Sequence, residues 1–271
     1  MDTKFMSKKR IHPTAIVAEE AVIADHVQIG PYSIIGPHVK IDTGTWINNH
    51  VVIEGHTSIG ERCQIFSGAC LGTDPQDKKY QKTRCYLDIG SDNIIREYVT
   101  IHPGSTEDAR TVIGDRNLLM IGCHIAHDCH LGNEIAIANN TGLSGHVKVE
   151  DQAVISGIVG IHQFVRVGKL SMIGGVSKVV KDVPPFSICD GHPAVFCGLN
   201  SVGLKRAGIS SKDALQIKKA LKILFASGLI FSNAVKKIKS EFPSHRDIQH
   251  LLAFAEESER GLPRGFGKSE E

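Results

Sequence analysis

An aliphatic residue recurs at every sixth position through more than half of this 271-residue chain. The count starts at Ile11 and keeps one register as far as Val179, with only three polar exceptions. These exceptions, Asp77, Thr83 and Glu107, fall in two short stretches. No α-helix or ordinary strand has a period of six, whereas each hexapeptide of a parallel β-helix supplies one short strand and one corner. The chain is therefore predicted to be mainly β, with a prism of stacked coils.

Three hexads close one triangular coil of about 18 residues, and neighbouring coils lie roughly 4.8 Å apart. A second inward position follows each aliphatic by four residues and carries a small or β-branched side chain, as at Ala15, Val27 and Cys63. Residues 11–180 then make about nine or ten coils, none of which buries a core alone. This hexad resembles the left-handed β-helix family, an exception to the usual handedness of parallel crossovers. The handedness is implied by that resemblance only.

The hexads divide the chain into three predicted parts. Residues 1–10 are a polar N-terminal extension, residues 11–200 form the left-handed parallel β-helix, and residues 201–271 form a small C-terminal α-helical domain. Two loops leave the prism, at 72–88 and 102–112, where the aliphatic count is interrupted. Insertions at the corners of a solenoid often build its binding face, so both loops are candidates for a site.

The C-terminal part carries several local signals. The paired prolines that begin at Pro184 are expected to end the sheet ladder, and after Asn200 apolar residues recur at helical spacing. Ser232 and Ser244 are the predicted N-caps of two helices. The residues from Gly261 onward are predicted to fray.

Composition limits the compartment and the partners. The formal net charge is only +2, and charged residues make up 22% of the chain, which excludes a polycation built to bind nucleic acid. The seven cysteines are odd in number and show no CxxC spacing, so reduced thiols in the cytoplasm are expected. No stretch is long and apolar enough to predict a signal peptide or a membrane span.

Histidines gather along one edge of the predicted prism. Residues 18 apart share a face wherever the repeat is unbroken, so the hexads that start at Ile125, Leu143 and Ile161 stack on one another. These hexads and the end of the preceding one carry His124, His127, Asp128, His146, His162 and Gln163. The phase across the two loops is not fixed by counting, so the placement of Asp77 and Lys79 relative to this edge stays open.

Two chemistries suit such a cluster. A neutral His127 beside the carboxylate of Asp128 can act as a general base, because the carboxylate orients the ring and stabilises the imidazolium. Alternatively, three histidines can bind zinc, provided that their nitrogens converge to about 2.1 Å from one point. The three histidines occupy different places in their hexads, which favours a general base without a metal.

The segment NLLMIGCHIAHDC, residues 117–129, resembles the signature of the bacterial UDP-N-acetylglucosamine O-acyltransferases, which commit the sugar nucleotide to lipid A. Supporting matches are DPQDKKY at 74–80, SGHV at 144–147, IHQF at 161–164, DVPPF at 182–186 and GLKR at 203–206. The resemblance spans nearly the whole chain. It implies transfer of an (R)-3-hydroxyacyl chain from acyl carrier protein to the glucosamine 3-position of UDP-N-acetylglucosamine. It also implies a homotrimer with sites between neighbouring prisms, no cofactor and no covalent intermediate.

The resemblance assigns roles to individual residues. His127 is implied to be the base, supported by Asp128, and the backbone N–H of Gly145 to stabilise the oxyanion. Gly175 falls where the family sets acyl length, and a glycine there is typical of long-chain members. Contacts to the sugar, the acyl chain or the nucleotide are implied for Gln76, Asp77, Lys79, His124, His146, His162, Gln163, Asn200 and Arg206.

This sequence departs from the family pattern near the nucleotide. Val202 and Ala207 replace an acidic residue and a second arginine that some members place there, and Pro103 stands where relatives often carry arginine. Weaker or rearranged nucleotide contacts are therefore expected. Candidates for docking an acidic carrier protein are Lys205, Arg206, Lys218, Lys219 and Lys222, with Arg166 nearby in sequence.

Four other functions stay open at this point. The acceptor can be a UDP diamino sugar, or the donor acyl-coenzyme A, without any change in the β-helix pattern. A zinc lyase of the gamma carbonic anhydrase type uses the same fold. A non-catalytic scaffold is the fourth alternative, but it leaves the His127–Asp128 pair unexplained.

Overall fold

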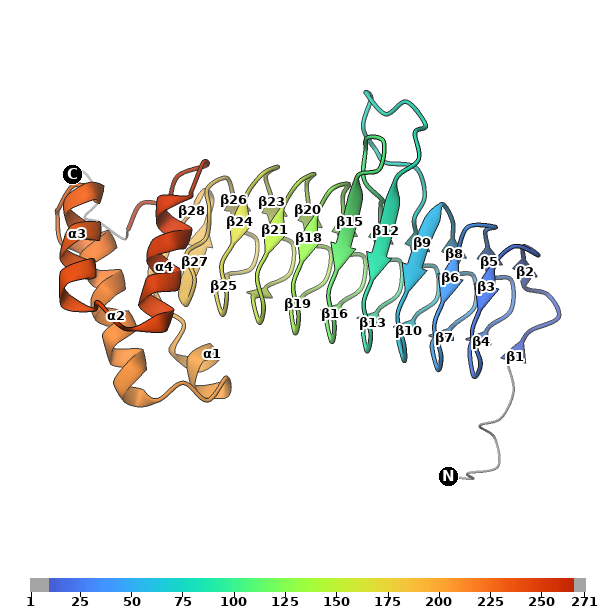
Figure 1. Ribbon diagram of the computed structural model, residues 1–271, viewed down its shortest axis with the longest axis horizontal. Coiled ribbons are helices and arrows are strands. Elements are labelled where there is room, and N and C mark those ends of the chain that lie inside the picture. Colours follow the sequence, from blue (N-terminus) through green and yellow to red (C-terminus); the bar gives the residue numbers. More distant parts are fainter. Residues whose placement is uncertain (1–9, 266–271) are drawn as a thin grey trace.

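The chain folds into a long three-sided prism with a group of helices at its C-terminal end (Figure 1). The computed structural model describes residues 10–265, so nearly all of the predicted N-terminal extension lies outside the described residues. The predicted fold class, a parallel β-helix followed by a small helical domain, is confirmed. Within residues 10–265 no helix is both long and apolar enough to cross a membrane.

Three sheets, here called faces A, B and C, form the sides of the prism. Face A contains β1 Arg10–Ile11, β4 Gln28–Ile29, β7 Trp46–Ile47, β10 Gln64–Ile65, β13 Ile94–Ile95, β16 Leu118–Leu119, β19 Ala136–Ile137, β22 Val154–Ile155, β25 Met172–Ile173, β27 Ser187–Gly191 and β28 Ala194–Leu199. Face B contains β2 Ile16–Val17, β5 Ile34–Ile35, β8 Val52–Ile53, β11 Cys70–Leu71, β14 Thr100–Ile101, β17 His124–Ile125, β20 Gly142–Leu143, β23 Gly160–Ile161 and β26 Lys178–Val179. Face C contains β3 Val22–Ile23, β6 Lys40–Ile41, β9 His56–Ile59, β12 Tyr86–Ile89, β15 Arg110–Ile113, β18 His130–Leu131, β21 Lys148–Val149 and β24 Arg166–Val167.

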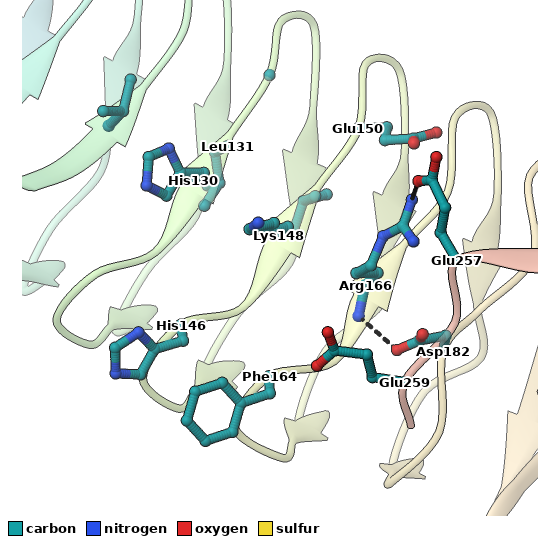
Figure 2. A pocket seen from close by; sticks show the side chains of 13 residues that line it. His130, Leu131, His146, Lys148, Glu150, Phe164, Arg166, Asp182, Glu257 and Glu259 are labelled. Carbon is teal, nitrogen blue, oxygen red and sulfur yellow. Dashed lines mark hydrogen bonds and ion pairs between the residues drawn. The ribbon is translucent and has the colours of Figure 1, made fainter. Parts of the chain in front are cut away.

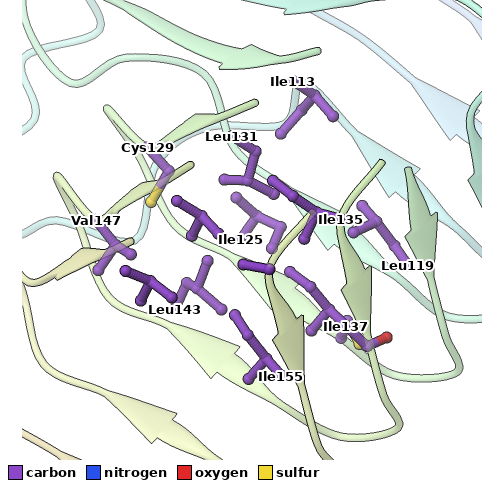
Figure 3. Close-up of a cluster of buried hydrophobic side chains, with 14 of the residues drawn as sticks. Ile113, Leu119, Ile125, Cys129, Leu131, Ile135, Ile137, Leu143, Val147 and Ile155 are labelled. Atoms are coloured by element: carbon purple, nitrogen blue, oxygen red, sulfur yellow. The ribbon is translucent and has the colours of Figure 1, made fainter. Parts of the chain in front are cut away.

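The register of these strands confirms the stacking predicted from the six-residue period. Each strand from β1 to β26 ends on the aliphatic residue of its hexad, and each from β1 to β23 pairs in parallel with the strand three places further along. Ile125 pairs with Leu143, and Leu143 pairs with Ile161. The aliphatic side chains and their small partners, such as Cys129 and Val147, fill the interior (Figure 3). Because each layer is thin, the core is one continuous column rather than a set of separate cores.

The backbone conformation at the corners of the prism suits several of the polar residues found there. The third residue after the aliphatic usually has a left-handed backbone, with φ of 60° at both His26 and Asp128 and 62° at His146. Asp, Asn and His tolerate this conformation better than most side chains. The sequence can therefore place a carboxylate or an imidazole at a corner without a large conformational cost.

The two insertions leave the same side of the prism and lie against each other (Figure 1). The first covers residues 72–85 and the second residues 102–109, so each ends a few residues earlier than predicted. The difference arises because β12 and β15 are longer than the usual two-residue strands. The backbone N–H of Asp108 donates to the carbonyl of Arg84 at 2.8 Å, and the Arg84 side chain contacts the carboxylate of Asp108 at 3.0 Å.

The C-terminal part corrects the expectation about the prolines. The ladder continues past them, because β27 pairs in parallel with β25. The prolines lie at a corner, where no ladder hydrogen bond is lost. Only β28 breaks the pattern, since it runs antiparallel to β27.

Four helices follow: α1 Ser201–Arg206, α2 Ser211–Ala226, α3 Phe231–Glu241 and α4 Arg246–Glu256. The predicted N-caps Ser232 and Ser244 are wrong, because the capping positions are Ile230 and His245 and neither makes a side-chain capping bond. Burial of the apolar faces of α3 and α4 sets where these helices begin, and this outweighs capping propensity.

The fraying predicted from Gly261 onward is also wrong for the described part of that segment. The carbonyl of Gly261 accepts a hydrogen bond from the N–H of Asp182, and the carbonyl of Arg264 accepts one from Phe196. Gly265 bridges to Phe196 as well. Residues 261–265 thus fasten the helical domain to the end of the prism.

Candidate active site

A histidine and a carboxylate meet at the corner between faces B and C. His127 Nδ1 lies 2.7 Å from Asp128 Oδ2, and only 14% and 11% of the two side chains are exposed. An ionised carboxylate can only accept, so Nδ1 carries the proton of the neutral ring. His127 Nε2 is then left unprotonated and able to accept a proton from a substrate.

The second insertion holds the same carboxylate from its other side. Ser105 Oγ donates to Asp128 Oδ2 at 2.6 Å, and the backbone N–H of Ser105 lies 3.3 Å from Oδ1. His146 Nε2 is 3.6 Å from Oδ2. Burial alone raises the pKa of Asp128, but the hydrogen bonds from Ser105 and His127 outweigh it, so the pKa lies below its usual value. Asp128 therefore stays ionised while it orients the imidazole.

Gly145 lies one coil beyond His127 and directly beneath its ring. A Cβ atom on Gly145 would be 2.5 Å from Cε1 and 2.7 Å from Nε2 of His127, so the close approach requires a glycine. The N–H of Gly145 has no hydrogen-bond partner among residues 10–265.

The corresponding N–H is paired at some other corners and, within the described part of the chain, unpaired at several, including Gly157, Gln163 and Gly175. At the paired corners the next coil can supply an acceptor: Ser91 donates to Asp115, Asp115 to Asn133, and Asn133 to Asp151. At others the residue is a proline, which has no N–H to satisfy. The N–H of Gly145 is distinguished by its place against the His127 ring, where it is available to a negatively charged oxygen.

A groove of about 480 Å³ runs along face B past this corner. It is lined by Gln76, His124, Ala126, His127, Gly142, Leu143, Ser144, Gly145, Gly160, Ile161, His162, Lys178, Val179 and Val180. Its floor follows one register, in which His124 pairs with Gly142, Gly142 with Gly160, and Gly160 with Lys178. No atom lies within 4 Å of the Cβ position of either glycine, so the two glycines leave an open strip between the polar ends.

Lys178 is a lining residue that the sequence reasoning missed. The sequence did contain a signal for Lys178. The 18-residue spacing that predicts the stacking of the histidines also leads from His124 through Gly142 and Gly160 to Lys178. Ser105 was missed for a different reason. It lies within an insertion, where the count carries no information on position.

His124 closes the groove near the base. Its Nδ1 lies 2.8 Å from the hydroxyl of Thr100, and its ring contacts that of His102 edge to face. Burial lowers the pKa of His124, and the charges of His102 and His127 lower it further. A neutral His124 is therefore expected at pH 7, with Nε2 free for a substrate.

His146 belongs to a second groove, of about 720 Å³, on face C (Figure 2). Its ring stacks on Phe164 with centroids 4.7 Å apart. Further along this groove Arg166 contacts Glu257 at 3.5 Å, beside other acidic side chains. This groove is the larger of the two, but His127 does not line it, so the chemistry is placed in the groove on face B.

The structure separates the predicted site residues into two groups. Within one chain the groove on face B brings together Gln76, His124, His127, Gly145 and His162. Its lining does not include Asp77, Lys79, Asp128, His146, Gln163, Gly175, Asn200 or Arg206.

Several members of the second group have other surroundings. The Asp77 carboxylate accepts from the N–H of Lys79 at 2.9 Å and so shapes its own loop. Asn200 is buried and caps α1, with its amide bonded to Gly203 and to the carbonyl of Leu170. Arg206 is exposed as the last residue of α1.

The histidine arrangement also bears on the zinc alternative. The ligand atoms of His127, Asp128 and His146 lie within 4.8 Å of one another, which makes them the one possible metal group found among residues 10–265. His162 is not part of this group, so the three histidines considered from the sequence do not converge within the described residues of one chain. Two histidines and a carboxylate that is already bonded to both Ser105 and His127 fit the general base better.

Comparison with known proteins covers nearly the whole chain. The family model for UDP-N-acetylglucosamine O-acyltransferase, domain 2, matches residues 182–263. The acyl-[acyl-carrier-protein]–UDP-N-acetylglucosamine O-acyltransferase of Thermodesulfovibrio yellowstonii is 51% identical over 255 residues, which is 94% of this chain and 99% of that relative. The chain belongs to the UDP-N-acetylglucosamine O-acyltransferase family.

Solved members of the O-acyltransferase family share its architecture. LpxA from Acinetobacter baumannii is 45% identical with a TM-score of 0.91, covering 94% of this chain and 99% of that one. UDP-N-acetylglucosamine O-acyltransferase from Moraxella catarrhalis is 41% identical with a TM-score of 0.90, at the same coverage. The similarity to these acyltransferases therefore extends over both the prism and the helical domain.

Proposed function

We propose that this protein transfers an (R)-3-hydroxyacyl chain from acyl carrier protein to the 3-hydroxyl of the glucosamine unit in UDP-N-acetylglucosamine. This reaction begins lipid A synthesis. The observation that carries the proposal is the His127–Asp128 pair set beside an unpaired backbone N–H, in a chain 51% identical to an acyl-[acyl-carrier-protein]–UDP-N-acetylglucosamine O-acyltransferase. We also propose that the protein acts in the cytoplasm.

The proposed reaction assigns one step to each group at this corner. His127 Nε2 removes the proton from the sugar hydroxyl, and the resulting oxygen attacks the carbonyl carbon of the thioester. The N–H of Gly145 stabilises the negative charge on the carbonyl oxygen in the tetrahedral intermediate. The carbon–sulfur bond then breaks, and the imidazolium returns its proton to the departing thiolate. The ester and the free carrier thiol are the products, and no cofactor is consumed.

We propose that the acyl chain binds along the open strip on face B. Gly142 and Gly160 keep side chains out of it, while Leu143, Ile161 and Val179 add apolar surface. Gly175 is proposed to set the chain length beyond this strip. Lys178 lies at the end of the strip, where its aliphatic stem can cover the chain while its charge stays in water.

The sugar and nucleotide contacts are proposed to involve a second subunit. Gln76, Asp77, Lys79 and His162 are assigned to the sugar or acyl chain, together with His124, His146 and Gln163. Asn200 and Arg206 are assigned to the nucleotide. Because Arg206 is exposed on α1 and the groove on face B is open, we propose a homotrimer in which the arginine of one subunit reaches the site of its neighbour.

Subunit mixing tests this arrangement. His127→Ala and Arg206→Ala homotrimers are each expected to be nearly inactive. When the two variants are co-expressed, mixed trimers should regain part of the activity, since some sites then hold an intact base and an intact arginine. No recovery in trimers shown by mass to be mixed would assign both residues to one chain.

A basic groove on the helical domain is the proposed docking surface for acyl carrier protein. Lys219, Lys222 and Lys237 line a groove of about 270 Å³ together with Ile223, Ala226, Ser227 and Glu241. Glu241 lies 3.8 Å from Lys237, so Lys219 and Lys222 carry the net positive charge of the groove. This combination suits an acidic, amphipathic partner. Of the other predicted docking residues, Lys205 and Lys218 are exposed, whereas the Arg166 guanidinium already lies against Phe254 and Glu257.

Donor specificity tests the docking surface. Lys219→Glu together with Lys222→Glu should raise KM for the carrier-protein donor and leave KM for UDP-N-acetylglucosamine unchanged. In the double variant, KM for the carrier-protein donor should change little with salt. In the wild type, the same KM should rise as ionic strength rises. Equal use of acyl-coenzyme A by the wild type would favour the alternative donor.

The central experiment measures acyl transfer from (R)-3-hydroxymyristoyl carrier protein to UDP-N-acetylglucosamine. His127→Ala should lower kcat on the order of 10²- to 10⁴-fold, as expected for loss of a general base. A wild type that acylates only a UDP diamino sugar would move the proposal to an N-acyl transfer at the same site. Retention of full activity by His127→Ala would overturn the assignment of the base.

A further inference from the structure

Ser105 reaches the active site from outside the repeat. It lies in the second insertion, yet both its hydroxyl and its backbone N–H contact the carboxylate of Asp128, at 2.6 Å and 3.3 Å. Oδ2 of that carboxylate therefore lies between two donors, Ser105 Oγ and His127 Nδ1. With both donors in place, the carboxylate has little freedom to turn away from the imidazole.

The insertion is built to hold Ser105 in this place. Gly104 packs so closely that a Cβ there would lie 2.3 Å from the backbone of Ala109, and its N–H donates to the carbonyl of Tyr86. Beyond Ser105, the N–H of Ala109 closes a turn on the carbonyl of Thr106. The contacts between Arg84 and Asp108 then brace this insertion against the first one.

We infer that Ser105 is a positioning residue of the reaction, which holds Asp128 in the orientation that directs Nε2 of His127 toward the sugar hydroxyl. The inference rests on the proposed role of His127 as the base. With Ser105 included, the His127–Asp128 pair becomes a hydrogen-bonded series of three side chains, Ser105, Asp128 and His127. Ser105 is the member that comes from the insertion. One purpose of the second insertion is thus to deliver this hydroxyl.

The chemistry of the hydrogen bond gives a readout that is specific to positioning. The hydroxyl of Ser105 takes up part of the carboxylate charge. Without it, more negative charge faces the ring, so the protonated form of the ring is favoured up to a higher pH. Besides His127, the titratable side chains that interact electrostatically with Asp128 are Cys85, Cys129, His130 and His146.

Ser105→Ala tests the inference through steady-state kinetics over a range of pH. The expected result is a fall in kcat on the order of 10- to 100-fold, as for loss of a hydrogen bond to a charged group. The acid limb of kcat/KM should move to higher pH, while KM for both substrates changes little. Ser105→Thr keeps the hydroxyl and should restore most of the rate. Thr106→Ala, an exposed neighbour in the same turn, is the matched control and should behave as wild type.

A double-mutant cycle separates this inference from the proposed base. In an Asp128→Asn background, Ser105→Ala should cost almost nothing further, because the carboxylate that it positions is gone. If His127→Ala is inactive but Ser105→Ala keeps the wild-type rate and acid limb, the inference is wrong and the base stands. A full additional loss in the Asp128→Asn background would assign Ser105 to the folding of the insertion. If His127→Ala stays active, the proposed base fails first.

Discussion

The imidazole ring of His127 lies directly over Gly145, its counterpart one coil further along, so that a methyl group on this glycine would meet Cε1 of the ring at 2.5 Å. The proposed base and the proposed oxyanion donor are thus neighbours in one stacked register. Their separation is set by the spacing of the coils rather than by a flexible loop. A site of this kind is positioned by the scaffold itself.

Gly145→Ala should displace the base without unfolding the protein. The added methyl group overlaps the His127 ring, and a shift of about 1 Å at a reacting group lowers the rate on the order of a hundredfold. The measurement is kcat alongside the melting temperature. Gly36→Ala is a matched control, because its Cβ would lie at an ordinary 3.4 Å from the nearest atom in an early coil. A Gly145→Ala enzyme with a wild-type kcat would contradict the close packing.

Acid should destabilise the fold partly through His124. Burial and two neighbouring histidines lower the pKa of His124 in the folded chain, whereas in the unfolded chain it lies near ~6.5. Between these values the unfolded chain binds more protons, so the free energy of unfolding falls as the pH drops below ~6.5. His124→Gln should reduce this loss. Urea unfolding of both proteins at neutral and mildly acidic pH makes the comparison, and an identical pH dependence would count against it.

Gly175→Met should shift the preference toward shorter acyl donors. The nearest atoms to a Cβ at this exposed corner are Gly157 O at 3.6 Å and Ser156 Cβ at 3.9 Å, so the larger side chain is accommodated without strain. It would narrow the path of a long chain. The measurement is the ratio of kcat/KM for 3-hydroxyacyl donors of different length. An unchanged ratio in a normally folded variant would remove Gly175 as the length determinant.

The adjacent glycine provides a contrast for that experiment. A Cβ on Gly174 would lie 2.3 Å from the carboxylate of Asp190. Gly174→Ala should therefore lower the melting temperature and leave the chain-length ratio unchanged.

Asp182→Ala should loosen the join between the prism and the helical domain. The carboxylate is buried and accepts from the N–H of Arg166 at 2.8 Å and from Ser258 Oγ at 2.7 Å. Removing it leaves both donors unpaired, at a cost of ~2–4 kcal/mol in the free energy of unfolding. Ser258→Ala should cost only about 1 kcal/mol, since the backbone bond survives. Calorimetry measures both, and equal losses would show that the backbone bond adds nothing.

The sequence alone determined the prism and part of its site. A six-residue period specifies where each coil turns, and parallel stacking then places residues 18 apart above one another, so His127, Asp128 and His146 could be placed at one edge by counting. Lys178 could have been found by the same count. This works because hydrogen bonds between coils leave almost no freedom of register.

The tertiary structure decided whatever the repeat does not control. Ser105 and Gln76 lie in insertions, where backbone contacts between Arg84 and Asp108, rather than a period, fix the path of the chain. The starts of α3 and α4 followed burial of their apolar faces instead of the serines nearby. In these places the conformation depends on many weak contacts between residues that are distant in sequence. A local sequence pattern cannot predict the combined effect of such contacts.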